Sequence, residues 1–173
     1  TNFIHGLPVY AISVALMHHD ELVLGVVYEI NKDECFYAWK GSKAYLNGKE
    51  IKVSKNNTLG KSLIATGFPY TNFAGIDNYL SILKQFMHVS HGVRRLGSAA
   101  VDLAYVACGR FDGFFEYNLN AWDVAAGALI VQQAGGKVCN FSGGAEFIKK
   151  REILATNALV ESEMLELLKG FDN

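Results

Sequence analysis

The hydrophobic pattern of this chain changes once, about a third of the way along, and that change limits the folds open to it. In the first part, short apolar runs alternate with polar turns, as in the run from Leu22 to Ile30 and the turn Asn31-Lys32-Asp33 that follows it. Runs of this length and composition are typical of strands. The dipeptide Asn47-Gly48 between two more such runs predicts a tight hairpin turn. We therefore expect residues 1–60 to form an antiparallel meander.

From residue 61 to residue 173, predicted strands alternate with predicted helices. Strands are expected over residues 62–66, 113–117, 137–141 and 152–156, and helices around residues 76–91, 100–108, 122–133 and 160–171. No internal repeat, low-complexity segment or Pro/Gly-rich linker interrupts this order. The pattern indicates one continuous α/β (α+β) unit with layered helices and sheets, so we interpret residues 1–173 as a single domain.

The first predicted helix has a clear apolar stripe. Ile76, Leu80, Leu83 and Met87 follow the spacing of one helical face. We expect this face to meet the core, and we expect the helix to end at Gly92.

Length and charge exclude several classes of function. The chain has 173 residues, of which 50% are hydrophobic, and this is enough for one substantial core. Sixteen basic and 17 acidic residues give a net charge of -1, which indicates neither a nucleic-acid nor a membrane partner. Cys35, Cys108 and Cys139 are far apart and lie in apolar segments, which favours buried, reduced thiols in a cytoplasmic protein. We expect small-molecule partners.

Asp123 stands in the first turn of a predicted helix, and the residues after it are nearly all small. A carboxylate at this position caps the exposed N–H groups of the helix, which is its common role. It is also an oxygen ligand of the kind that Mg²⁺ prefers. The spacing alone leaves both interpretations open.

Gly97, Ser98 and Ala99 open another predicted helix, with Ser98 as the expected N-cap. A helix start without bulky side chains can bind an anion or a polar ligand atom, although an ordinary capped helix is the simpler interpretation. Glu116 interrupts an aromatic strand, where it either faces solvent, as most Glu residues do, or binds a ligand. Arg94 and Arg95 are adjacent, so at most one of them is expected to enter a given site.

Other chemistries have little support in the sequence. The five histidines lack metal-ligand spacing and a partner nucleophile. Neither a nucleophile elbow nor a glycine-rich phosphate loop is present. Covalent and nucleotide-loop mechanisms are therefore disfavoured.

Taken together, four segments resemble the inositol monophosphatase family of Mg²⁺-dependent, lithium-sensitive phosphatases. They are Thr-Asn-Phe-Ile-His-Gly-Leu-Pro at residues 1–8, Gly-Ser-Ala-Ala-Val-Asp-Leu at 97–103, Asp-Gly-Phe-Phe-Glu at 112–116, and Trp-Asp-Val-Ala-Ala-Gly at 122–127 with Ala-Gly-Gly at 134–136. The last segment resembles the family's C-terminal signature. The first resembles the tail of the N-terminal signature D-P-x-D-G-[TS]-x-N, with Thr1 at the position before Asn2.

The resemblance implies a function and a set of site residues. Family members form a layered α-β-α-β-α sandwich and hydrolyse phosphomonoesters such as myo-inositol monophosphate, using a water activated by Mg²⁺. Asp123 matches one metal ligand and also belongs to the expected substrate contacts. Gly97, Ser98 and Ala99 match the segment that contacts the substrate. Glu116 matches the carboxylate that accepts hydrogen bonds from polyol hydroxyls.

The other metal ligands and the catalytic residues of the family belong to the acidic half of the N-terminal signature and to residues before it. We expect them upstream of Thr1, together with the N-terminal layer of the fold, so the resemblance implies no catalytic residue within these 173 residues. The chain alone is expected to have little or no activity, since Mg²⁺ sites draw on more than one carboxylate. A homodimer is expected by the same analogy.

Two alternatives stay open. Relatives with the same metal site hydrolyse nucleoside 3',5'-bisphosphates or sugar bisphosphates instead. A non-catalytic binding or oligomerisation module is the other possibility, because the acidic motif is absent from the chain.

Overall fold

The structure is a computed structural model that describes residues 1–171. Its first half contains β1 (Ala11–His18), β2 (Glu21–Glu29), β3 (Glu34–Trp39), β4 (Ala44–Leu46), β5 (Lys49–Ile51), the 3-10 helix η1 (Leu59–Lys61), β6 (Leu63–Thr66) and α1 (Ile76–Val89). Its second half contains β7 (Gly92–Arg94), α2 (Ala99–Ala107), β8 (Gly113–Tyr117), α3 (Ala121–Gln133), β9 (Lys137–Cys139), α4 (Phe147–Lys150), β10 (Glu152–Thr156) and α5 (Glu161–Leu168).

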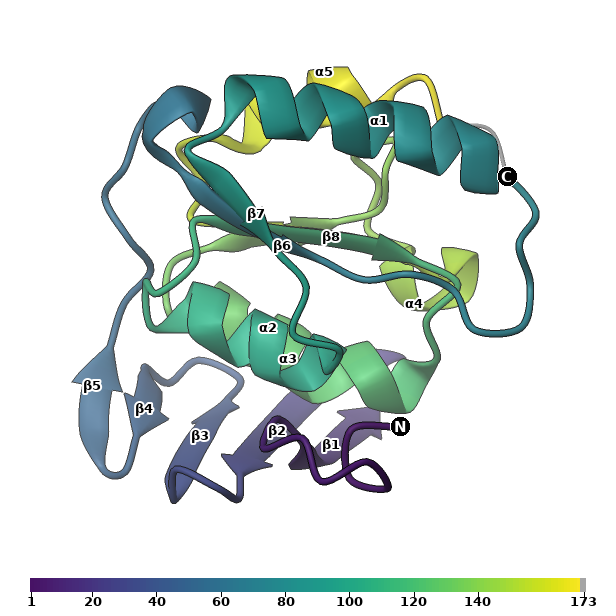
Figure 1. Cartoon of the computed structure of the whole chain (residues 1–173). Helices are drawn as coiled ribbons and strands as arrows, with labels where there is room; N and C mark the ends of the chain where they lie inside the picture. The colour runs from purple at the N-terminus through teal and green to yellow at the C-terminus, as the bar shows by residue number, and fades with distance from the viewer. Residues whose placement is uncertain (172–173) are drawn as a thin grey trace.

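These elements stack in four layers (Figure 1). Helices α1 and α5 cover one face of a mixed sheet with the order β7-β6-β8-β10-β9, and α2 and α3 lie on its other face. Below α2 and α3 lies the second sheet, in which β1 to β5 follow one another as an antiparallel meander. The expected layered α/β architecture is confirmed.

The outer face of the meander sheet is rich in exposed apolar side chains. In β1, Ile12, Val14 and Leu16 alternate along one face and are 53%, 51% and 57% exposed. Among residues 1–171, no element covers them.

The hairpin between β4 and β5 has the geometry that its sequence predicts. Asn47 and Gly48 both have positive φ angles, 48° and 80°. Two central residues with positive φ define the turn that matches the twist of paired strands. Asn47 also accepts a hydrogen bond from the backbone N–H of Cys35 at 2.8 Å, which ties the turn to β3.

The buried face of α1 differs from the predicted one. Leu80 and Met87 are 46% and 64% exposed, whereas Tyr79, Ile82 and Phe86 are buried. The helix carries two apolar stripes, and the one that contains Tyr79 and Phe86 faces the sheet. Phe86 stacks on a phenylalanine of β8 with 4.3 Å between the ring centroids, which stabilises this orientation.

The predicted end of α1 was also wrong. The helix ends at Val89, and Gly92 begins β7, which pairs in parallel with β6. The spacing of apolar residues does not reveal a three-residue strand.

Other boundaries differ at short elements. The helix α4 and the 3-10 helix η1 were not predicted, and β9 ends at Cys139 rather than residue 141. Of the three thiols, all free, only Cys139 is fully buried, while Cys35 and Cys108 are half-buried. In the described part of the chain, no helix is long and apolar enough to cross a bilayer.

Candidate active site

Three parallel strands of the mixed sheet end at the same edge. Strand β6 pairs in parallel with β7 and with β8, and the register places Thr66 beside Phe115 and Ala65 beside Arg94. The residues that follow these positions, Gly67, Glu116 and Arg95, therefore reach one region of the molecule. Ligands of α/β proteins commonly bind at the carboxyl ends of parallel strands.

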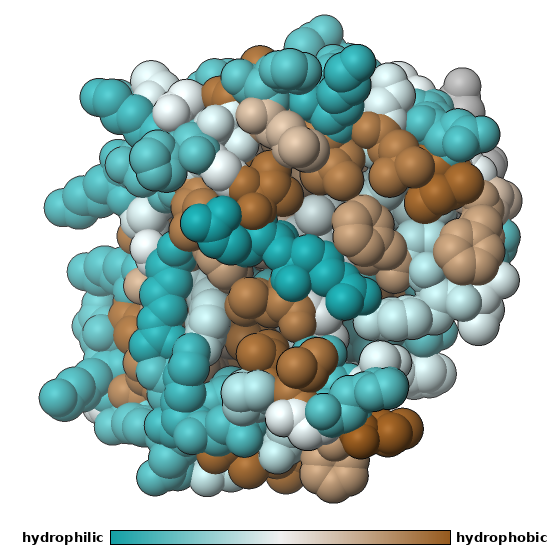
Figure 2. Space-filling view, viewed as in Figure 1, coloured by the Kyte–Doolittle hydropathy of each residue, from teal (hydrophilic) through white to brown (hydrophobic). Residues whose placement is uncertain are grey.

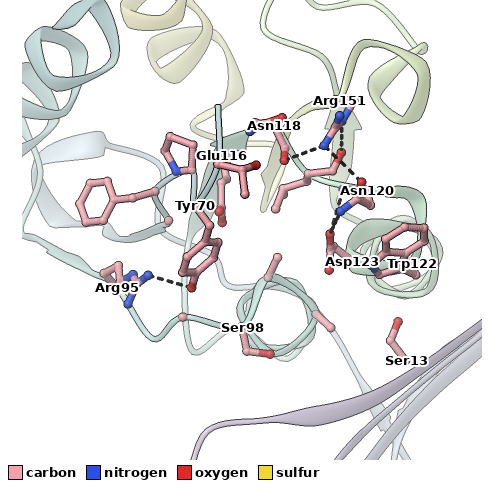
Figure 3. Close-up of a pocket in the computed structure, with 18 of the residues that line it drawn as sticks. Ser13, Tyr70, Arg95, Ser98, Glu116, Asn118, Asn120, Trp122, Asp123 and Arg151 are labelled. Atoms are coloured by element: carbon pink, nitrogen blue, oxygen red, sulfur yellow. Dashed lines mark hydrogen bonds between the residues drawn. The ribbon is translucent and has the colours of Figure 1, made fainter. Parts of the chain in front are cut away.

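A cavity of about 550 Å³ lies at this edge (Figure 3). Its walls come from the ends of the three strands, the first turns of α2 and α3, and β1. The five residues singled out by the resemblance, Gly97, Ser98, Ala99, Glu116 and Asp123, all line it. Gly97 and Asp123, which lie 26 positions apart in the chain, thus line the same cavity.

Glu116 is the buried carboxylate of this cavity. The residue is only 6% exposed, which corrects the solvent-facing interpretation, and within residues 1–171 no group donates a hydrogen bond to its carboxylate. A Cβ atom on Gly67 would lie within 2.2 Å of the Glu116 carboxylate, so the carboxylate rests directly against the Gly67 backbone. Burial raises the pKa of Glu116 to about 8, and the Asp123 charge adds to this while Arg95 opposes it.

A second buried carboxyl lies in α2. Asp102 is 1% exposed, and neither of its side-chain oxygens has a hydrogen-bond partner in the described residues. Burial raises the pKa of Asp102 well above its ordinary value, and the charge of Glu116 adds to this. The two buried carboxyl groups therefore influence each other's ionisation.

The raised pKa of Glu116 predicts a pH-dependent stability. The folded state holds the proton more tightly than the unfolded chain, so stability is lost as pH rises from about 4.5 to about 8. The Glu116→Gln variant does not ionise there. The difference in free energy of unfolding between Glu116→Gln and the unmodified chain should therefore change in favour of the variant, by up to about 1.4 kcal/mol for each pH unit in this window.

Urea unfolding between pH 5 and pH 8 measures this difference. Glu146→Gln, which removes an exposed carboxylate, is the matched control. A pH dependence for Glu116→Gln no steeper than that for Glu146→Gln would contradict the burial of an ionisable carboxyl.

The start of α2 is held open by Gly97 and by the N-terminal segment. Gly97 has a φ of 84°, and the Asn2 amide lies 3.2 Å from the position of a Cβ there. Asn2 is buried and its Nδ2 donates to the carbonyl oxygens of Val9 at 2.8 Å and Leu96 at 2.9 Å. Ser98 occupies the expected N-cap position but makes no side-chain capping bond, so its hydroxyl is available.

Asp123 fills the capping role that the sequence left open, and one of its oxygens stays unpaired. It is the third residue of α3, and its Oδ2 accepts a hydrogen bond from the backbone N–H of Asn120 at 2.8 Å. Its Oδ1 accepts no hydrogen bond in the described part of the chain, and the residue lines the cavity. The helix is thus capped by one oxygen while the other remains available to a ligand.

Several cavity residues were not singled out from the sequence. Arg151 lies opposite the end of β8, where Nε donates to Leu119 O at 3.0 Å and Nη2 to Asn118 O and Asn120 Oδ1 at 3.2 Å. Tyr70 and the exposed Trp122 form part of the rim. Tyr70 could have been found from the sequence, because it lies in the turn that follows a predicted strand. Arg151 directly precedes β10, and it reaches the cavity only because β10 pairs with β8.

The described residues contain one candidate metal ligand in the cavity. Residues 1–171 hold no cluster of three or more His, Cys, Asp or Glu side chains suited to a metal ion. The free Oδ1 of Asp123 fits one coordination position of Mg²⁺, an ion that is held by one or two carboxylates, waters and substrate phosphates.

The fold and the cavity define a class of protein. A layered α/β scaffold brings an unpartnered buried carboxylate, a free aspartate oxygen and an open helix start to one polar cavity. Such a site is suited to a small ligand that carries both hydroxyl and anionic groups.

Comparison with known proteins identifies the family. The model of the inositol monophosphatase family matches residues 1–170. The putative Nus factor SuhB of Neisseria meningitidis is 47% identical over 98% of this chain, and an inositol-1-monophosphatase of Mesorhizobium japonicum is 40% identical over 98%. The structure of inositol monophosphatase from Anabaena superimposes with a TM-score of 0.93 at 38% identity, covering 99% of this chain and 68% of that one.

The chain belongs to the inositol monophosphatase family, as its sequence motifs predict. It spans 65% of the length of the Neisseria relative and 64% of the Mesorhizobium relative.

Proposed function

We propose that the complete protein hydrolyses a phosphomonoester of a small polyol, such as myo-inositol monophosphate, with Mg²⁺ as cofactor. The observation that carries this proposal is Glu116, a buried carboxylate without a protein donor on the wall of a polar cavity. An unpaired buried carboxylate is costly, and hydroxyl groups of a polyol would satisfy it. Family membership supports the phosphate part of the substrate.

In this proposal, each residue of the cavity has a defined task. Glu116 in its ionised form accepts hydrogen bonds from substrate hydroxyls, and the start of α2 at Gly97, Ser98 and Ala99 binds polar oxygen atoms of the substrate. Asp123 holds the metal through Oδ1. Bound Mg²⁺ supplies charge neutralisation at the phosphate and an activated water.

The position of Asn2 supports a shared site with upstream residues. Its amide lies against Gly97 at the cavity wall. Residues immediately before Thr1 would therefore start close to the cavity, where an acidic motif could contribute further ligands. Without such residues the 173-residue chain is expected to be inactive.

Phosphate release tests the proposal. The complete protein should hydrolyse myo-inositol 1-phosphate when Mg²⁺ is present, lose the activity when Mg²⁺ is chelated, and be inhibited by Li⁺. The 173-residue chain should show no activity above background under the same conditions. Equal rates for the chain and the complete protein would contradict the assignment of the missing ligands.

Two other functions are kept as candidates. Hydrolysis of a sugar bisphosphate or a nucleoside bisphosphate is one of them, and a panel of phosphate esters distinguishes it from hydrolysis of a monophosphate. The Neisseria relative is named as a Nus factor and not as a phosphatase, so a non-catalytic binding role is kept as the other candidate. Absence of Mg²⁺-dependent hydrolysis of every ester by the complete protein would favour that role.

We further propose a cytoplasmic homodimer. Apolar side chains gather over α1, where Leu80, Met87 and Val89 are exposed, and a second copy is a suitable cover for them (Figure 2). The three free thiols are consistent with a reducing compartment. Sedimentation of the complete protein measures the oligomeric state.

A further inference from the structure

Two buried hydroxyl groups tie the end of β6 to β8. Thr66, the last residue of β6, donates through Oγ1 to the carbonyl oxygen of Phe115 at 2.9 Å. The hydroxyl of Tyr79 lies 2.6 Å from the same Oγ1 and donates to Phe115 O at 3.2 Å. Tyr79 is fully buried and Thr66 is 1% exposed, so water does not compete for these hydrogen bonds.

The side chain of Tyr79 is held in place by its neighbours. It comes from α1, and its ring packs against the rings of Phe115 and Tyr117, with 5.5 Å and 4.7 Å between the centroids. Burial raises the pKa of Tyr79 well above its ordinary value, the hydrogen bond with Thr66 opposes this, and the charge of Glu116 adds to it. Tyr79 is therefore a neutral hydroxyl within electrostatic reach of Glu116.

Tyr79 does not contact the cavity itself. Helix α1 covers the face of the mixed sheet that is opposite to α2 and α3, whose first turns line the cavity (Figure 1). Neither Tyr79 nor Thr66 is among the described residues that line it. Any influence of Tyr79 on a ligand must therefore pass through the two strands.

Both strands lead from these hydrogen bonds directly into the cavity. Gly67 follows Thr66 at the end of β6. Glu116 follows Phe115 in β8, and no group of the described residues donates a hydrogen bond to its carboxylate. A Cβ atom on Gly67 would lie 2.1 Å from Oε2 of Glu116, so the carboxylate rests on the Gly67 backbone. Its position in the cavity therefore depends on how the end of β6 lies relative to β8.

We propose that Tyr79, acting with Thr66, is a positioning residue that holds the Glu116 carboxylate where it meets the hydroxyl groups of the substrate. Without the Tyr79 hydroxyl, the buried Oγ1 of Thr66 loses a hydrogen-bond partner, which is costly. The end of β6 then shifts relative to β8, and Glu116 moves with it because it rests on the backbone of Gly67. This inference rests on the proposed function, in which Glu116 binds the hydroxyl groups of a polyol phosphate.

The test compares two phosphomonoesters in the complete protein and its Tyr79→Phe variant. The ring of myo-inositol 1-phosphate offers hydroxyl groups to Glu116, whereas the ring of phenyl phosphate offers none. The quantity measured is the ratio of kcat/KM for the inositol ester to kcat/KM for phenyl phosphate. A change in metal binding or in the folded fraction acts on both esters and cancels in this ratio. The ratio should fall about tenfold in Tyr79→Phe, as expected for the loss of one hydrogen bond to a charged group.

Tyr117→Phe is the matched control, because Tyr117 is also buried but its hydroxyl has no hydrogen-bond partner among the described residues. Removal of that hydroxyl should leave the ratio unchanged. Thr66→Val, which removes the other hydroxyl, should lower the ratio as Tyr79→Phe does, and Thr66→Ser, which keeps a hydroxyl, should restore most of it. An unchanged ratio in Tyr79→Phe, or an equal fall in Tyr117→Phe, would overturn the proposal.

A structural measurement separates this proposal from the proposed function. If the complete protein hydrolyses neither ester, the proposed function fails, and if it hydrolyses only one, the ratio is undefined. In both cases, crystal structures of the complete protein with Tyr79→Phe and with Tyr117→Phe decide on the positioning role. A Glu116 carboxylate displaced from Gly67 in Tyr79→Phe alone supports this role. The same carboxylate position in both variants refutes it.

Discussion

Replacing Asp123 by Asn in the complete protein should lower kcat/KM for a phosphomonoester about a hundredfold or more. The Oδ1 atom of Asp123 accepts no hydrogen bond from the described residues and is available to a metal ion. Glu116, the other carboxyl group of the cavity, is less suited to this role because burial raises its pKa to about 8 and so disfavours its charged form. An amide oxygen is a much weaker ligand for Mg²⁺ because it carries no charge. Loss of several kcal/mol of charge stabilisation corresponds to this drop in rate.

The same substitution should leave the fold intact. The amide oxygen of Asn at position 123 can still accept the hydrogen bond from the backbone of Asn120, which Asp123 Oδ2 accepts at 2.8 Å. Asp77 provides a matched control, because it also stands in the first turn of a helix but is exposed on α1. Phosphate-release kinetics and thermal unfolding of Asp123→Asn and Asp77→Asn measure both effects. Hydrolysis at the original rate in Asp123→Asn would exclude Asp123 as a metal ligand.

Replacing Gly25 by Ala should destabilise the fold by about 3 kcal/mol. Gly25 lies in the middle of β2, where a Cβ would stand 2.5 Å from the carbonyl oxygen of Ala126 in α3. The clash is with backbone, which cannot rotate away as a side chain can, so the helix and the meander sheet must separate. Ala126 is buried and lies one helical turn after Asp123, and the same contact therefore supports the site.

Gly60→Ala is the control for this prediction. A Cβ on Gly60 would lie 3.7 Å from the nearest atom outside its neighbours, an ordinary contact. Chemical unfolding should place Gly60→Ala within about 0.5 kcal/mol of the unmodified chain. If Gly25→Ala were as stable as Gly60→Ala, the close approach of β2 and α3 would be wrong.

Much of the architecture could be predicted from local pattern. The turn at Asn47-Gly48, the strands over residues 113–117 and 152–156, and the helix that ends before Gly135-Gly136 follow from turn chemistry and periodicity, and the structure has them at these positions. Such features depend on a few neighbouring residues, which is why one sequence suffices to read them. The buried face of α1 did not follow, because two apolar stripes compete on that helix.

The site divides in the same way. Gly97, Glu116 and Asp123 were singled out because they match family motifs, and the structure places them around one cavity. Arg95, Tyr70 and Arg151 have no motif to mark them.

The sequence by itself determined the order of the longer strands and helices, the family, and the residues that carry its motifs, because each of these depends on residue type and local spacing. Only the tertiary structure decided which residues meet. The parallel pairing of β6 with β7 and β8 brings Arg95 to the same edge as Glu116, and the burial of Glu116 sets its raised pKa. Both effects come from contacts between segments that are far apart in the chain, where local pattern carries no information.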